Sequence, residues 1–175
     1  MRKLSMDELN RVSAEEFKSQ EKNNIVVVLD NIRSLNNVGS SFRTGDAFAI
    51  EKVVLCGITG KPPHRDIHKT ALGAQDTVAW EHFDETVDAI KKLKEEGYKV
   101  YAVEQVEGST MLQDLETTKD EKIALVFGNE VMGVSDEAIE EVDAALEIPQ
   151  FGTKHSLNVS VTIGVVLWQV LQKKM

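Results

Sequence analysis

The 175-residue chain has a single cysteine, Cys56, which excludes an internal disulfide and a cysteine-rich metal site. No apolar run approaches the roughly 20 residues that a membrane-spanning helix needs, and the N-terminus lacks a secretory-signal pattern. Internal repeats, low-complexity segments and dividing linkers are absent as well. These absences predict one globular unit in the reducing cytoplasm, long enough to bury a substantial core.

Several signatures of common enzyme classes are also missing. No Gly-x-Gly-x-x-Gly pattern opens the first helix, and no Gly-x-Ser-x-Gly elbow occurs. The stretch 57–61 lacks the spacing and the hydroxyl of a phosphate-binding P-loop. His64 and His68 are four residues apart, but no carboxylate follows them at motif spacing, so no metal site is predicted.

Basic charge is scarce overall, since the formal net charge is −9. The acidity is concentrated between Glu81 and Glu147, where 19 acidic residues accompany 6 basic ones. Residues 1–80 hold 11 basic and 10 acidic residues, and residues 148–175 hold three basic and no acidic ones. The net charge alone argues against a nucleic-acid partner, but its distribution leaves room for a local basic patch.

The hydrophobic pattern predicts an α/β fold. The β-branched run 25–29 is typical of a parallel strand buried on both faces, and such strands alternate with helical patterns along the chain. The expected fold is a mostly parallel sheet flanked by helices. Further strands are predicted at 52–56, 78–83, 98–103, 123–127 and 144–148, with helices over the first 20 residues and at 37–48, 85–96 and 161–171. The segment 57–65 is predicted to be an exposed loop, and 107–119 has no assignment.

The first motif is Asn36-Asn37-Val38-Gly39-Ser40-Ser41-Phe42-Arg43, which follows the first strand and opens a helix. One interpretation is a capped helix that carries a solvated arginine. The other places Arg43 beside the carboxyl end of a strand, where α/β proteins bind ligands. The planar guanidinium of arginine suits phosphate recognition.

The second motif, Gly128-Asn129-Glu130 with Gly133, directly follows the apolar run 123–127. A glycine turn followed by a helix capped by Ser135 explains part of it. It does not explain Glu130, because a carboxylate at the end of a buried strand is costly without hydrogen-bond donors. A functional role for Glu130 is the alternative.

The third motif lies near the C-terminus, where Ser156-Leu157-Asn158-Val159-Ser160 opens an apolar helical run. Ser156 is predicted to cap this helix, which leaves Asn158 and Ser160 as poor helix formers at its start. Polar residues at such a position usually hold a neighbouring backbone or a ligand. Together with the second motif, they predict one small-molecule site at two strand ends.

Taken in order, the three segments resemble the motifs of the SpoU (TrmH-type) family of RNA 2′-O-ribose methyltransferases, part of the SPOUT superfamily. The resemblance covers about residues 24–173 and implies an α/β fold with a C-terminal deep trefoil knot. It further implies homodimers, with the apolar helix 161–171 facing a partner, and S-adenosylmethionine as cofactor. By the resemblance, the cofactor-binding residues are Phe127, Gly128, Asn129, Gly133, Ile148 and Leu157.

The same resemblance implies the catalytic groups. Arg43 would act as the base or stabilise the developing alkoxide, and because free arginine stays protonated, stabilisation is the simpler role. Asn37, Glu130, Ser156 and Asn158 would orient Arg43, the ribose or one another. The implied substrate is tRNA or rRNA, with tRNA favoured, and no metal is implied.

Two features depart from the family pattern. Gln150 and Phe151 stand where relatives often carry methionine and a small apolar residue, and no separate RNA-binding domain accompanies the core. Residues 1–22 are expected to form a short helical extension, and 23–175 the methyltransferase domain. RNA would then be recognised by a basic patch on the core, predicted at Arg33, Lys61, His64, Arg65, Lys69 and Lys154.

Two other functions remain open on the sequence alone. One is a catalytically silent RNA-binding protein that keeps the knotted fold. The other is a generic doubly wound small-molecule protein, which the acidic composition favours.

Overall fold

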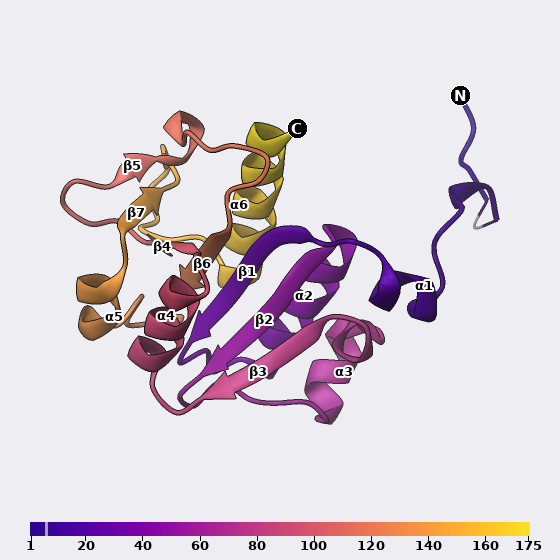
Figure 1. The fold of residues 1–175 in the computed structure, drawn as a ribbon, viewed down its shortest axis with the longest axis horizontal. Coiled ribbons are helices and arrows are strands. Elements are labelled where there is room, and N and C mark those ends of the chain that lie inside the picture. The colour runs from indigo at the N-terminus through magenta and orange to yellow at the C-terminus, as the bar shows by residue number, and fades with distance from the viewer. Residues whose placement is uncertain (6) are drawn as a thin grey trace.

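The computed structural model describes residues 1–5 and 7–175. One sheet of seven strands runs in the order β3-β2-β1-β6-β4-β7-β5 (Figure 1). Every pairing in it is parallel, which confirms the α/β class predicted from the alternating pattern. The strands are β1 (Asn23–Asp30), β2 (Ile50–Cys56), β3 (Ala79–Phe83), β4 (Lys99–Val103), β5 (Thr110–Met111), β6 (Ile123–Phe127) and β7 (Ala144–Glu147).

Helices cover both faces of the sheet. Helices α2, α3 and α6 pack on one face, and α4 and α5 pack on the other. Among the described residues, no helix is long and apolar enough to cross a membrane. The helices are α1 (Ala14–Ser19), α2 (Leu35–Ala47), α3 (Arg65–Ala71), α4 (Thr86–Glu95), α5 (Asp136–Glu141) and α6 (Val159–Lys174), with short 3-10 turns η1 (Asp7–Leu9), η2 (Ala74–Asp76) and η3 (Leu112–Asp114).

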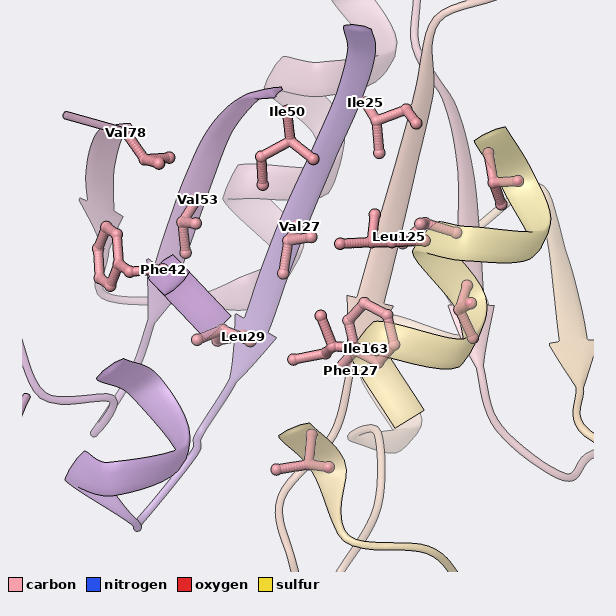
Figure 2. Close-up of a cluster of buried hydrophobic side chains, with 14 of the residues drawn as sticks. Ile25, Val27, Leu29, Phe42, Ile50, Val53, Val78, Leu125, Phe127 and Ile163 are labelled. Atoms are coloured by element: carbon pink, nitrogen blue, oxygen red, sulfur yellow. The ribbon is translucent and has the colours of Figure 1, made fainter. Parts of the chain in front are cut away.

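The central strand β1 shows why the sheet is buried on both sides. Its alternate side chains Ile25, Val27 and Leu29 belong to the core under α2 and α6, as Figure 2 shows. Val26 and Val28 point to the opposite core, under α4 and α5. A continuous apolar run therefore satisfies two layers at once, which is the pattern that a parallel sheet requires.

The prediction for the first 20 residues is wrong, because they do not form one amphipathic helix. Among the described residues of this stretch, only η1 and α1 are helical. The apolar residues at near-helical spacing are Leu4, Leu9, Val12 and Phe17, and of these Phe17 alone is buried. Ser13 and Glu16 form a capping box that starts α1 afresh. Figure 1 shows the segment before α1 lying away from the sheet. Met6, which falls inside the predicted helix, lies outside the described residues.

The loop predicted at 57–65 ends earlier than expected. His64 caps α3, with its Nδ1 accepting a hydrogen bond of 3.1 Å from the Asp66 N–H, and Arg65 is already helical. Helix α3 has only seven residues and buries only Ile67 and Ala71, so its apolar period is too short to stand out in the sequence. The unassigned stretch 107–119 contains β5 and η3.

Candidate active site

Loops at the carboxyl ends of β4, β6 and β7 enclose a cleft of about 760 Å³, together with the start of α6. All six predicted cofactor-binding residues line this cleft, and so do Glu130, Ser156 and Asn158 of the predicted catalytic set. The second and third sequence motifs therefore form one site, as their positions after two strands indicated. The cofactor-binding predictions found in the lining are Phe127, Gly128, Asn129, Gly133, Ile148 and Leu157.

Glu130 finds the donors that its position demanded. Its carboxylate accepts hydrogen bonds of 3.0 Å from the backbone N–H groups of Arg33 and Ser34 and from the Asn37 side-chain amide. Burial by itself would raise the pKa of this carboxyl, but these donors outweigh burial and hold the pKa below its ordinary value. Glu130 is thus an anion that fastens the loop after β6 to the loop after β1.

Asn37 links this anion to the C-terminal helix. Its side-chain Oδ1 lies 3.4 Å from Asn158 Nδ2, at the start of α6. Asn158 Oδ1 in turn accepts hydrogen bonds from the Ser160 N–H at 2.9 Å and the Ser160 hydroxyl at 2.6 Å. Side chains from all three motifs thereby form one chain of polar contacts.

The cap of α6 corrects the sequence prediction. Asn158 caps the helix, not Ser156, which lies exposed two residues earlier in the cleft lining. This placement explains a poor helix former at position 158, since asparagine favours the N-cap, where its side chain satisfies a free N–H. Ser160 then lies in the first turn, where its hydroxyl donates to the same cap.

Asn129 shapes the loop after β6 from within. Its Oδ1 accepts hydrogen bonds from the N–H groups of Val131 and Met132, at 2.9 and 3.1 Å, and its Nδ2 donates to the Asn31 carbonyl at 2.7 Å. Val131 and Met132 are left strongly exposed on the cleft lining. The Asn129 side chain is therefore committed to the protein, and only the loop that it forms lies open to a ligand.

The loop after β6 requires glycine at positions 128 and 133, because other atoms of the protein lie too close to leave room for a side chain there. A Cβ at Gly128 would lie 2.0 Å from the Gly133 carbonyl carbon and from the Val134 nitrogen. Gly133 has a φ of +73°, and a Cβ there would lie 2.4 Å from Glu104 Oε2. The backbone of the loop therefore folds back on itself more tightly than any side chain permits.

Sequence reasoning missed two acidic anchors. Asp30 is buried and accepts hydrogen bonds from the Thr86 hydroxyl at 2.6 Å and the Ser135 N–H at 2.8 Å. Glu104 lines the cleft and accepts from the Val134 N–H at 3.1 Å. Asp30 ends β1, and Glu104 directly follows β4. The argument that a carboxylate at the end of a buried strand needs hydrogen-bond donors, which was used for Glu130, would therefore have identified both.

Arg43 lies apart from the cleft. It is exposed on α2, six residues beyond Asn37, and is not among the residues that line the cleft. Within the described chain its guanidinium takes part in no ion pair. The structure therefore joins four of the five predicted catalytic residues to the cleft region and leaves the fifth outside it.

The predicted basic patch is exposed and differs from the lysines of α4 in one respect. The lysines of α4 pair with carboxylates, Lys92 with Glu81 at 2.6 Å and Lys94 with Asp143 at 3.1 Å. No ion pair between described residues involves the basic residues of the patch, so its charge is not neutralised locally. The unpaired exposed Lys and Arg residues of the patch are Arg33, Lys61, Arg65, Lys69 and Lys154.

One apolar surface remains uncovered on the C-terminal helix. The α6 positions Val161, Val165 and Trp168 are 53%, 40% and 56% exposed, although they lie one turn apart on the same stripe. The opposite stripe, with Ile163 and Val170, is buried in the core. The helix is therefore apolar on two sides, as predicted, but this chain covers only one of them.

Comparison with known proteins agrees with these motifs. The profile of the SpoU rRNA Methylase family matches residues 24–168. A tRNA (guanosine(18)-2′-O)-methyltransferase of Thermus thermophilus is 30% identical over 168 residues, covering 96% of this chain and 84% of the relative. The crystal structure of the A. aeolicus TrmH/SpoU tRNA modifying enzyme has a TM-score of 0.79 at 27% identity, covering 91% of this chain and 79% of that one. An AdoMet-bound rRNA methyltransferase from Sinorhizobium meliloti has a TM-score of 0.80 at 26% identity, covering 89% and 58%.

Proposed function

Because the chain belongs to the SpoU rRNA Methylase family, we propose that it methylates a ribose 2′-hydroxyl of tRNA or rRNA, using S-adenosylmethionine. The observation that carries the proposal is the polar chain Glu130–Asn37–Asn158, which joins the three family motifs beside one cleft. Relatives named for tRNA methylation, from Thermus thermophilus and Aquifex aeolicus, make tRNA the favoured substrate.

The cleft residues fit a cofactor that carries positive charge. S-adenosylmethionine supplies an electrophilic methyl group on a cationic sulfonium. The carboxylates of Glu104, Glu130, Asp136 and Glu147 line the cleft, and opposite charges at short range favour binding. Apolar Ile148 and Leu157 line it too and offer surface for a purine ring. Gly128 and Gly133 keep the loop backbone free of side chains beside it.

When bound, the cofactor would supply its methyl group to the ribose oxygen and would leave as a neutral thioether, and the hydroxyl proton would pass to solvent. The ribose hydroxyl is a weak acid, so the transition state gains from a cation beside the developing oxyanion. Arg43 fills that role, because arginine keeps its charge at neutral pH. Asn37, Glu130, Ser156 and Asn158 hold the loops and the ribose in a reactive orientation.

We propose that two copies pair through the exposed stripe of α6. Helix α2, which carries Arg43, packs against α6, so a second copy on this stripe would approach both helices. Contiguous apolar surface of this kind marks interaction sites on soluble proteins. Pairing offers a route for Arg43 to reach a cleft, because this residue lies outside the cleft of its own chain.

We also propose the trefoil knot that the family resemblance implies. Two contacts support it, because the chain after β7 touches both ends of the segment 104–121. Gln105 Nε2 donates to the His155 carbonyl at 2.9 Å, and Lys174 Nζ donates to the Thr118 carbonyl at 3.0 Å. Pulling the chain from its two ends would test the proposal: a knotted chain extends less than its full contour length, and full extension would contradict the knot.

The proposed methyltransferase domain is 23–175, with 1–22 as an extension, and the family match to residues 24–168 supports this division. RNA binding is assigned to the unpaired cations of the basic patch. We also propose a cytoplasmic location, because the proposed substrate is tRNA or rRNA.

The decisive experiment is methyl transfer from radiolabelled S-adenosylmethionine to undermethylated tRNA and rRNA, resolved by RNA size and nucleoside. Label in a 2′-O-methylnucleoside is the expected result. Arg43→Ala should abolish transfer while the protein still binds the cofactor, and Lys91→Ala on the opposite face should leave transfer unchanged. Cofactor and RNA binding without transfer by the unmodified protein would favour a silent RNA-binding protein instead.

A further inference from the structure

We propose that a shallow groove beside Trp80, outside the cleft, binds an unpaired nucleotide of the RNA. This inference rests on the proposed function, since it assumes an RNA substrate. The groove has a volume of about 630 Å³ and lies between the start of α3, η2 and the edge strand β3. Nothing in the family motifs falls in it.

Trp80 supplies a flat apolar surface at this groove. It lies on β3, the last strand at one edge of the sheet, and its side chain is 38% exposed. Among the described residues, the indole N–H has no hydrogen-bond partner. An exposed tryptophan beside cations is a suitable platform for a nucleobase, because every base offers a π-face and stacking tolerates any sequence.

Basic residues lie around this platform. Arg65 lines the groove together with the imidazoles of His64 and His68, and Lys61 and Lys69 belong to the same short stretch of chain. Arg65 forms no ion pair with any described residue, so its guanidinium can meet a phosphate. In a chain of net charge −9, unneutralised positive charge next to an exposed indole favours a polyanion with rings over a protein partner.

The groove also offers polar groups for a base edge. Gln75 Nε2 donates to Asp76 Oδ2 at 3.0 Å and lies 2.9 Å from His68 Nδ1. The amide nitrogen of Gln75 can only donate, so His68 Nδ1 accepts in this contact. The carboxylate of Asp76, which also lines the groove, already has the Gln75 amide as a donor.

A rigid contact fixes the groove relative to the active site. The Thr70 hydroxyl of α3 donates to the Asn36 carbonyl of α2 at 2.9 Å. A Cβ at Gly39 would lie 2.1 Å from Thr70 Oγ1, so the two helices touch with no side chain between them. Because Asn37 belongs to the same turn of α2, a nucleotide held at Trp80 would sit at a set distance from the cleft.

The test compares Trp80→Ala, Trp80→Phe and a control, Lys91→Ala, on the opposite face. Their affinities are measured without cofactor for an RNA hairpin with an unpaired loop and for a perfect duplex of equal length. We expect Trp80→Ala to lose about tenfold in hairpin affinity, with duplex affinity unchanged. Trp80→Phe should stay within about threefold of the unmodified protein. Tryptophan fluorescence gives a second readout. The part of the emission that is missing in Trp80→Phe comes from Trp80 and not from Trp168, and hairpin RNA should quench this part.

Unchanged hairpin affinity in Trp80→Ala would overturn the subsite. A change in the oligomeric state of Trp80→Ala would overturn it too, since the groove would then be a protein interface. Methyl transfer to the same RNA distinguishes this failure from that of the proposed function. If the unmodified protein transfers methyl and Trp80→Ala binds normally, only the subsite is wrong. If no RNA is methylated but Trp80→Ala loses hairpin binding, the subsite stands and the enzyme proposal fails.

Discussion

The side-chain amide of Asn37 donates a 3.0 Å hydrogen bond to the carboxylate of Glu130, which lies 93 residues further along the chain. The contact joins the first turn of α2 to the loop after β6. Because Asn37 also approaches Asn158, a change at any one of the three positions should be felt at the other two.

Replacing Asn37 should weaken cofactor binding by loosening that loop. Asn37→Ala removes a hydrogen bond to a charged group, a contact of about 1.5–3 kcal/mol, so we expect affinity for S-adenosylmethionine to fall about tenfold or more. Combining it with Glu130→Gln should add little, because both remove the same contact. Calorimetric titration measures this, with Asn36→Ala as the control. Fully additive losses would mean that the two residues act separately.

Because the pKa of Glu130 is lowered in the folded protein, the stabilisation that this residue contributes should decrease at low pH. The folded-state pKa lies below the ordinary value of 4.5, so the stabilisation is complete above that pH and is lost as pH falls through the folded pKa. The difference in melting temperature between the unmodified protein and Glu130→Gln should be constant above about pH 6 and shrink below pH 4.5. Thermal unfolding from about pH 3 to 7 measures it; a difference independent of pH would refute the assignment.

A methyl group at Gly128 should distort the cleft. Its Cβ would lie 2.0 Å from backbone atoms, which cannot move aside as a flexible side chain can. Gly128→Ala should cost about 1–3 kcal/mol in the free energy of unfolding and reduce cofactor affinity more than tenfold. At Gly152 a Cβ meets nothing within 4 Å, so Gly152→Ala is the matched control. Equal behaviour of the two variants in thermal unfolding and cofactor titration would contradict the close approach.

A charge on the exposed stripe of α6 should separate the proposed dimer. Val165 is 40% exposed in the single chain, so Val165→Lys should leave the fold intact but place an ammonium in the paired interface. Light scattering after size exclusion should report a monomer, whereas Glu95→Lys on α4 should behave like the unmodified protein. An unmodified protein that is already monomeric would remove the basis for pairing through α6.

Reversing charge in the basic patch should change how RNA binding depends on salt. Lys61→Glu with Arg65→Glu removes two unpaired cations, so affinity should fall and the slope of log affinity against log salt should flatten by about 1.4 for single-stranded RNA. Filter binding over a range of salt concentrations measures both. The control reverses Lys91 and Lys119 to glutamate. An unchanged slope would place RNA elsewhere on the molecule.

The sequence by itself determined the class of fold and the position of the cleft. Short apolar runs such as 25–29 and 123–127, set between helical patterns, are typical of parallel strands buried on both faces. Glu130 had to find donors, because a carboxylate at the end of a buried strand is otherwise too costly. Both conclusions follow from local composition, so no knowledge of distant contacts was needed.

Only the tertiary structure decided which residues meet. The partners of Glu130 lie more than 90 residues away, and the family resemblance grouped Asn37 with Glu130 and Asn158 without identifying which of them touch. The cap of α6 moved from Ser156 to Asn158 because the cleft loop extends further than local preference predicts. The groove at Trp80 is assembled from α3, η2 and an edge strand, none of which carries a recognisable motif. Such sites depend on packing between elements, which a one-dimensional pattern does not encode.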